Sequence, residues 1–290
     1  MPIGLDSYSF HRLLGELRPG EEDPGTRLAD GGVAVITEAR SLGVDGVSLE
    51  TCFLEPPGRL DVEALRGAAR PLELVLAWGA PNGLELGSRE APLRDLLAWI
   101  GVASDLGCTT MRIVAAGPVL RARAAAELPN LVAPLKRAAA HARAAGLELA
   151  LENHGDLTAA QVAELIERVE DDALGVCFDT ANALRVGDDV LEAARLLAND
   201  VRMVHLKDCE PLDGVADPVA GPRSVPFGEG VVPLRGVLEV LPPHVLICVE
   251  LGQLGPGHVD ERALVRQALD WLRELDTPAA ENVERAAGLT

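Results

Sequence analysis

One nearly continuous apolar run ends in three polar side chains: Leu147-Glu148-Leu149-Ala150-Leu151-Glu152-Asn153-His154. Apolar runs of this length are typical of strands that are covered on both faces, as in a parallel sheet. The preceding segment, Asn130–Ala145, has apolar residues at helical spacing and is followed by Gly146, a residue type that often ends helices. A helix that leads into a buried strand is the repeating unit of α/β folds.

The same kind of short, β-rich run recurs along the 290 residues, and helical patterns separate several of the runs. The predicted strands are Ile3–Tyr8, Val44–Glu50, Leu72–Trp78, Thr109–Ala115, Leu147–Glu152, Leu174–Asp179, Val201–His205 and Val245–Glu250. The other predicted helices are Ala91–Leu106, Thr158–Val169, Asp188–Leu197 and His258–Leu275. Strands that alternate with helices in this way indicate a parallel sheet.

Eight strands with intervening helices fit a closed (β/α)8 TIM barrel of the α/β class, which we predict as a single domain over residues 1–290. The alternative is an open doubly wound sheet, which usually has a glycine-rich turn after its first strand. Tyr8-Ser9-Phe10-His11 contains no glycine. Two long connections, His11–Asp30 and Asp208–Glu229, are predicted to be functional, and Thr277–Thr290 is either a final helix or a frayed tail.

The charge balance restricts the partners of this chain. Lys and Arg total 26 against 45 Asp and Glu, which gives a net charge of −19. Nucleic acids and anionic membranes attract basic surfaces, so we expect neither as a partner. No apolar run reaches the roughly 20 residues of a membrane span, and the first residues lack the pattern of a signal peptide, so a cytoplasmic location is predicted. The five cysteines are scattered without a CxxC pair, which disfavours a disulfide framework or a thiolate zinc site.

Charged side chains occur at the ends of four successive predicted strands: Glu152, Asp179, His205 and Glu250. Since parallel strands of a barrel all end on one face, these side chains should meet there. Three carboxylates and one imidazole suit a single divalent ion, with Mn²⁺ preferred and Mg²⁺ or Co²⁺ as alternatives. The competing interpretation is that each group is satisfied locally by Lys207, Arg112 or backbone amides.

The same positions carry a resemblance to a known family. Residues 149–154, Phe178-Asp179-Thr180-Ala181-Asn182, His205-Leu206-Lys207-Asp208 and Val249-Glu250 resemble the xylose isomerase-like TIM-barrel superfamily, and most closely its sugar phosphate isomerase/epimerase group. The resemblance implies that Glu152, Asp179, His205 and Glu250 bind one divalent metal. It also implies that Glu152 and Glu250 exchange protons on opposite faces of a ketose. A metal that polarises a carbonyl would lower the cost of the enediolate between the two proton transfers.

Residues near these strand ends are further candidates. His154 lies two residues after Glu152 and could contact substrate or orient a ligand, while Lys207 shares the strand face of His205 and could bind an anionic group. The competing interpretations are an ordinary loop histidine and a lysine that pairs with Asp179 or Asp208. Many ketose epimerases of the family have a histidine where this chain has Asn182, so Asn182 is a candidate for holding a substrate hydroxyl.

Other candidates for substrate binding follow the first, second and seventh strands. They are Tyr8, His11, Arg12, Glu50 and Arg223. Arg12 and Arg223 are the cations that an anionic substrate would require. The competing interpretations are an exposed loop start for the first three and an ion pair with Arg112 for Glu50.

These observations together predict an enzyme of carbohydrate metabolism. It would isomerise or epimerise a small polyhydroxylated keto or aldo compound, possibly anionic, through a metal-stabilised enediolate. The main alternative keeps the metal but makes the protein a decarboxylase or lyase of a 3-oxo sugar acid. An abasic-site endonuclease, disfavoured by the acidic charge and the few histidines, and a non-catalytic sugar-binding barrel are the remaining alternatives. A homo-oligomer is compatible with the apolar parts of the outer helices.

Overall fold

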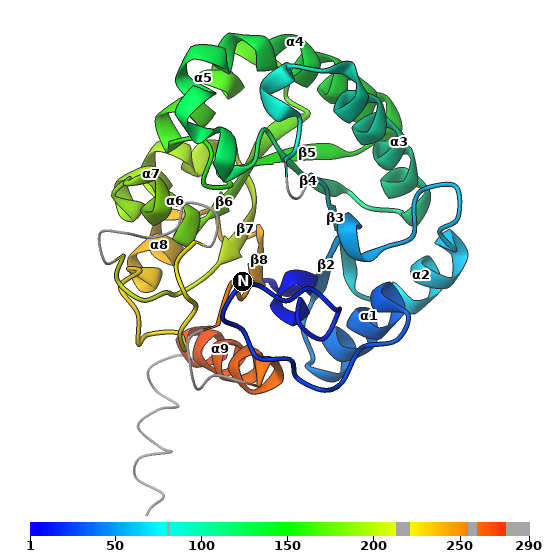
Figure 1. Cartoon of the computed structure of the whole chain (residues 1–290), viewed down its shortest axis with the longest axis vertical. Helices are drawn as coiled ribbons and strands as arrows, with labels where there is room; N and C mark the ends of the chain where they lie inside the picture. The colour runs from blue at the N-terminus through cyan, green and yellow to red at the C-terminus, as the bar shows by residue number, and fades with distance from the viewer. Residues whose placement is uncertain (80–81, 213–220, 255–259, 277–290) are drawn as a thin grey trace, which may run out of the picture.

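The computed structural model describes residues 1–79, 82–212, 221–254 and 260–276, and its eight parallel strands form one closed barrel (Figure 1). Each strand pairs with the next along the chain, and β1 also pairs with β8, so the predicted barrel is confirmed and the open sheet is wrong. The strands are β1 (Ile3–Asp6), β2 (Gly46–Glu50), β3 (Glu73–Ala77), β4 (Thr110–Val114), β5 (Glu148–Glu152), β6 (Leu174–Asp179), β7 (Val201–Leu206) and β8 (Leu246–Val249).

The helices surround the barrel, as Figure 1 shows. They are α1 (Gly31–Ser41), α2 (Val62–Ala69), α3 (Glu90–Leu106), α4 (Arg121–Ala145), α5 (Ala159–Val169), α6 (Thr180–Val186), α7 (Val190–Leu197), α8 (Leu234–Val240) and α9 (Glu261–Asp276). Within the described part of the chain, no helix combines the length and the apolar character needed to span a bilayer.

The protein has two apolar cores, one inside the barrel and one between the barrel and the helices. Since successive side chains of a strand point to opposite faces, one set of residues packs under the helices and the other fills the barrel. The outer set is large and includes residues of the strands and the helices. The inner set is small and comprises Val75, Ala150, Cys177, Met203, Leu246 and Cys248. Above this inner layer, towards the carboxyl ends of the strands, the interior is polar.

Two boundaries differ from the sequence-based expectation for a clear local reason. Strand β1 ends at Asp6, because Asp6 caps a 3-10 helix, η1 (Ser7–Phe10), that contains Tyr8. Helix α4 begins at Arg121 rather than after Pro129, because buried Ala124 and Leu128 extend its apolar stripe. The predicted strand Leu174–Asp179 is found as β6, and α6 follows it directly with Asp179 as its N-cap. The segment Thr277–Thr290 and residue His258 lie outside the described residues.

Thr158 begins α5 with a reciprocal pair of hydrogen bonds. The backbone N–H of Gln161 donates to Thr158 Oγ1 at 3.3 Å, and the backbone N–H of Thr158 donates to Gln161 Oε1 at 2.9 Å. Such a capping box satisfies two amides that the helix itself leaves unpaired. Replacing Thr158 by alanine should therefore lower the free energy of unfolding by about 1 kcal/mol in chemical denaturation. Thr37→Ala, at an exposed position inside α1, should cause no such loss, and equal midpoints for the two variants would contradict the capping role.

Candidate metal centre

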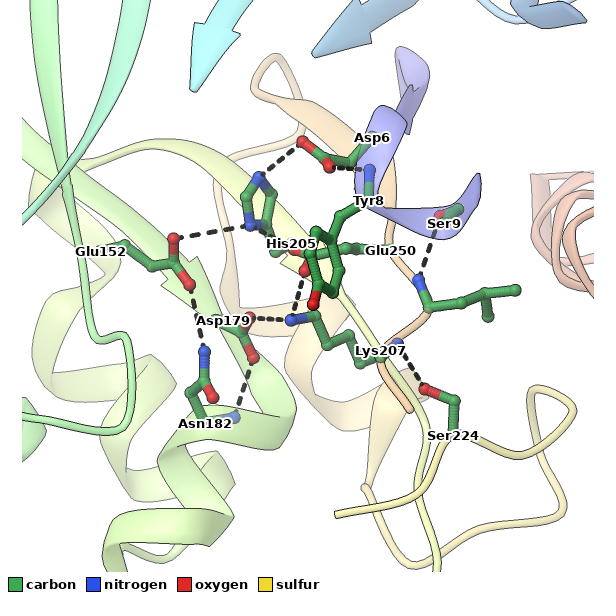
Figure 2. A network of polar contacts seen from close by, with 12 residues as sticks. Asp6, Tyr8, Ser9, Glu152, Asp179, Asn182, His205, Lys207, Ser224 and Glu250 are labelled. Carbon is green, nitrogen blue, oxygen red and sulfur yellow. Dashed lines mark hydrogen bonds and ion pairs between the residues drawn. The ribbon is translucent and has the colours of Figure 1, made fainter. Parts of the chain in front are cut away.

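The four predicted ligands lie at the carboxyl end of the barrel interior (Figure 2). Each follows an interior apolar residue by two positions, and the pairs are Ala150 and Glu152, Cys177 and Asp179, Met203 and His205, and Cys248 and Glu250. Since side chains two residues apart on a strand share a face, all four point into the barrel. The strand pattern of the sequence thus brings them to one place.

The ligand atoms approach one another closely. One atom each from Asp179, His205 and Glu250 lies within 4.8 Å of the other two. Glu250 Oε2 is 2.6 Å from His205 Nδ1, and Glu152 Oε2 is 3.8 Å from the same nitrogen. All four residues are at most 5% exposed. The structure therefore assembles three carboxylates and one imidazole in a buried cluster.

Hydrogen bonds between β5 and α6 position the first two carboxylates. The side chain of Asn153 makes two hydrogen bonds of 2.8 Å to the backbone of Asp179. Asn153 Nδ2 donates to the Asp179 oxygen, and Asn153 Oδ1 accepts the Asp179 N–H. Asp179 Oδ1 caps α6 by accepting the backbone N–H of Asn182 at 2.8 Å. Asn182 Nδ2 in turn donates to Glu152 Oε1 at 3.1 Å. Asn182 therefore lies at the centre and orients a predicted ligand.

Two hydroxyl groups hold the ends of β7 and β8. Thr180 Oγ1 donates to the backbone oxygen of Lys207 at 2.8 Å and accepts its N–H at 2.9 Å. Ser9 Oγ donates to the backbone oxygen of Val249 at 3.1 Å and accepts the N–H of Leu251 at 3.0 Å. Glu250 lies between the last two residues, so its backbone is fixed on both sides.

Lys207 places a positive charge between two of the carboxylates. Its Nζ is 2.7 Å from Asp179 Oδ2 and 2.6 Å from Glu250 Oε1. Burial lowers the pKa of Lys207, but Asp179 and Glu250 outweigh burial and raise the pKa above its ordinary value. Lys207 therefore stays cationic at the centre. The competing interpretation from the sequence expected Lys207 to pair with Asp179 or Asp208, and the structure shows the pair with Asp179. Asp208 accepts backbone N–H groups of its own loop instead.

Arg112 of β4 supplies a second buried cation. Its Nε lies 2.8 Å from Glu152 Oε2, and its Nη2 contacts Glu50 Oε1 at the end of β2. All three side chains are almost fully buried. The structure thus assigns Glu50 to Arg112, as the competing interpretation expected, and substrate contact by Glu50 stays a prediction.

The donor atoms fit a divalent cation. Several buried donor atoms of the four ligands have charged neighbours but make no hydrogen bond within the described residues. They are Glu152 Oε2, Asp179 Oδ2, Glu250 Oε2 and both ring nitrogens of His205. Burial lowers the pKa of His205, but the adjacent Glu250 carboxylate helps to raise the pKa well above its ordinary value. The surroundings of His205 therefore favour positive charge. Oxygen and imidazole donors are those that Mn²⁺, Mg²⁺ and Co²⁺ accept.

A thiol lies beside this cluster as well. Cys177, directly below Asp179 in the barrel, has its sulfur within 4.8 Å of donor atoms of Glu152 and His205. Burial raises the pKa of Cys177 to about 11, so the sulfur is an uncharged thiol at neutral pH. The sequence provided no sign of this contact, because Cys177 belongs to no metal-binding spacing.

His154 is close to the centre but is held neutral. Burial, Arg112, Lys207 and Arg185 lower its pKa to about 3. Its Nδ1 has no hydrogen-bond partner among the described residues. A neutral imidazole can accept or donate a hydrogen bond but carries no charge to stabilise an anion.

The predicted rim residues of the first connection organise that connection. The ring of Tyr8 stacks on His11 at 4.9 Å between centroids, and its hydroxyl donates to Glu16 at 2.8 Å. His11 Nε2 is 3.0 Å from Glu21. Arg12 pairs through Nε with Glu261 of α9 at 3.2 Å, and both side chains are buried. Arg12 thus joins the connection to the last helix, and a role for these residues in substrate binding stays a prediction.

The four ligands do not line the cavity found in the described part of the chain, and a role of Arg223 in substrate binding stays a prediction. Arg223 is exposed in the connection after β7. A cavity of about 360 Å³ lies instead beyond the ends of β2 and β3, where Cys52, Trp78, Asp95 and Trp99 are among its lining residues. None of the four ligands is among the residues that line it. Trp78 donates to Asp95 at 2.7 Å, which fixes one wall.

Asp6 is a buried carboxylate at the centre that the sequence analysis missed. It ends β1 as Glu152 ends β5, and its Oδ2 lies 3.6 Å from His205 Nε2 (Figure 2). The run Ile3-Gly4-Leu5-Asp6 has the same form as the other strand endings, but extending the strand to Tyr8 hid it. Recognising Asp6 as the cap of the next turn would have revealed the position.

Comparison with known proteins identifies relatives that cover most of the chain. The chain is 29% identical over 272 residues to 2-epi-5-epi-valiolone 7-phosphate 2-epimerase from an Actinoplanes species, and the match covers 88% of this chain and 94% of that protein. The structure of D-psicose 3-epimerase with D-tagatose from Clostridium cellulolyticum has a TM-score of 0.70 at 15% identity, and covers 94% of this chain and 99% of that one.

A probable 3-DHS dehydratase from Bacillus anthracis has a TM-score of 0.67 at 16% identity, with coverage of 94% of this chain and 99% of that one. At such identities, the structural likenesses show the fold alone. A family model described as xylose isomerase-like TIM barrel matches residues 36–275, which include all four predicted ligands. The chain therefore belongs to the xylose isomerase-like TIM-barrel family.

Proposed function

We propose that this protein is a divalent-metal-dependent isomerase or epimerase of a sugar or sugar phosphate. The observation that carries the proposal is the buried convergence of Asp179, His205 and Glu250, with Glu152 beside them, at the carboxyl end of the barrel. Active sites of this barrel form at that end. The relative from Actinoplanes supports the proposal, because its name describes the 2-epimerisation of a 7-phosphate compound.

Glu152, Asp179, His205 and Glu250 would hold the cation, with Mn²⁺ the best match to these donors and Mg²⁺ or Co²⁺ as alternatives. A bound cation supplies polarisation of the substrate carbonyl and stabilises the negative charge that develops on its oxygen. The buried carboxylates of the centre, which are Asp6, Glu50, Glu152, Asp179 and Glu250, outnumber the cations Lys207 and Arg112 and so leave room for the charge of such an ion. The ligands and the ion would together form the floor of the substrate site.

Glu152 and Glu250 are the proposed proton-transfer groups. They come from strands separated by β6 and β7, so they approach the centre from different sides. Burial raises the pKa of Glu250, but Lys207 and His205 outweigh burial and hold the pKa well below its ordinary value. Glu250 is therefore ionised at neutral pH and able to accept a proton from carbon. Asn182 fixes Oε1 of Glu152, while Oε2 lies between Arg112 and His205.

Lys207 and His154 are proposed to contact the substrate. Lys207, which stays cationic, would stabilise an oxyanion or bind a carboxylate or phosphate group. His154, which stays neutral, would hydrogen-bond a hydroxyl group. The substrate class is accordingly a small polyhydroxylated keto or aldo compound, with an anionic group as an option that Lys207 supports.

The second candidate function is decarboxylation or another lyase reaction of a 3-oxo sugar acid. The observation that favours it is Lys207, a buried cation beside the carboxylates that could hold the carboxylate of such an acid. The same stabilised enediolate would then form by loss of CO₂ rather than of a proton.

Product analysis separates the two functions. We expect incubation with a panel of ketoses, 3-oxo acids and their phosphates in D₂O to yield an epimer or isomer that carries deuterium next to the carbonyl, as detected by NMR. Proton abstraction by a carboxylate requires this label, since the abstracted proton exchanges with solvent. Release of CO₂ without any epimer would establish the second candidate instead. Failure of every compound to react while metal and sugar bind would indicate a non-catalytic binding protein.

A further inference from the structure

Asp6 lies at the centre without belonging to the four proposed ligands. It is the last residue of β1 and is fully buried. Its Oδ1 accepts the backbone N–H of Tyr8 at 2.7 Å, which caps the following turn. Its Oδ2 has no hydrogen bond within the described residues and lies 3.6 Å from His205 Nε2. One oxygen of Asp6 therefore serves the backbone, and the other faces the imidazole.

The two ring nitrogens of His205 face different carboxylates. Nδ1 is 2.6 Å from Glu250 and 3.8 Å from Glu152, so it points to the proposed ligands. Nε2 points the opposite way, to Asp6. A neutral imidazole has one N–H and one lone pair, and a metal binds the lone pair. Which nitrogen carries the hydrogen thus decides whether His205 can act as a ligand on the side of Glu250.

We propose that Asp6 is a positioning residue that keeps the hydrogen of His205 on Nε2 and so directs the Nδ1 lone pair towards the metal. This inference rests on the proposed metal-dependent function. At 3.6 Å the contact is longer than a hydrogen bond, but a buried carboxylate attracts an N–H and repels a lone pair at this distance. Replacing carboxylates that accept the N–H of a metal-binding histidine typically changes metal affinity by 10–100-fold, and Asp6 occupies the corresponding side of His205.

The substitution Asp6→Asn separates this role from the capping role. Asparagine keeps an oxygen that can accept the Tyr8 N–H, but it replaces the carboxylate with an amide group. The expected result is a folded protein whose affinity for Mn²⁺ falls by about 10–100-fold. The measurement is the titration of chelator-treated full-length protein with Mn²⁺, following the free ion by electron paramagnetic resonance. Thermal unfolding in the presence of chelator reports the fold independently.

Asp45→Asn provides a matched control. Asp45 also accepts a backbone N–H of β1, that of Ile3 at 2.8 Å, but at the opposite end of the strand. This variant should bind Mn²⁺ as the wild type does, whatever its loss of stability. Unchanged Mn²⁺ affinity in folded Asp6→Asn, beside tight binding by the wild type, would overturn the inference alone. Absence of stoichiometric Mn²⁺ binding by the wild type would overturn the metal centre together with it.

The unmodified protein offers a second test that needs no variant to fold. Long-range ¹H–¹⁵N spectra of the protein loaded with Zn²⁺, which is diamagnetic, distinguish the two ring nitrogens of His205. We expect the hydrogen on Nε2 and the metal on Nδ1. A hydrogen on Nδ1 would overturn the inference.

Discussion

Replacing Glu152 or Glu250 by glutamine should reduce kcat by about 10³-fold, because the amide cannot take up or return a proton. The side chains keep their size and one oxygen donor, so the fold should persist. The two variants should also differ from each other. Since Glu152 and Glu250 approach from different sides, each variant should still exchange the hydrogen of one epimer with D₂O, and the exchangeable epimer should be opposite in the two. Steady-state rates and NMR of the exchanged sugar measure both effects.

Glu148→Gln is the control for Glu152→Gln, since the two glutamates share β5. Glu148 is exposed at the amino end of the strand, where it pairs with Arg202 at 3.0 Å. This variant should retain the rate of the wild type. Full turnover by both Glu152→Gln and Glu250→Gln would mean that other groups move the proton, and the proposed mechanism would then be wrong.

Removal of the metal should abolish turnover as well. Stabilisation of a developing oxyanion by a cation contributes several kcal/mol, so chelation should slow the reaction by roughly 10³-fold or more, and Mn²⁺ should restore it. Asp179→Ala should abolish turnover in a way that added Mn²⁺ does not restore, because the variant lacks one of the proposed ligands. Elemental analysis of protein purified without added metal should find stoichiometric Mn, Mg or Co in the wild type and none in this variant.

Loss of Asp179 also removes the cap of α6, and Asp189→Ala controls for that effect. Asp189 caps α7 in the same way by accepting the N–H of Glu192 at 2.9 Å, at an exposed position. Both variants should lose about 1 kcal/mol of stability from the missing cap. Only Asp179→Ala should lose the metal. Equal metal content in the two variants would place the ion elsewhere.

The architecture was predictable because it depends on local patterns. Buried parallel strands require continuous apolar runs, and helices between them require apolar residues at helical spacing. The positions of Glu152, Asp179 and Glu250 at strand ends follow from where each apolar run stops. The exact end of a strand is less well encoded, as Tyr8 shows: its apolar ring continues the strand pattern, although the chain turns already at Asp6.

The relation of the ligands to one another could also be inferred from the sequence, because residues two apart on a strand share a face. The competing interpretation of local pairing could not be decided in the same way. The structure contains both arrangements: Lys207 and Arg112 lie against the carboxylates, while buried donor atoms of the four ligands still converge. Arg12 illustrates the limit of reasoning from charge alone, since its partner on α9 is remote in sequence.

The sequence by itself determined the eight strands, the polar residue at which several of them end and the acidic character of the centre, because these properties depend on neighbouring residues along the chain. Only the tertiary structure decided which charges meet. Closure of the barrel through the pairing of β1 with β8 brings Asp6 to His205, and the narrow interior brings Arg112 to Glu50 and Glu152. Such contacts depend on the position of side chains across the barrel, which no local pattern records.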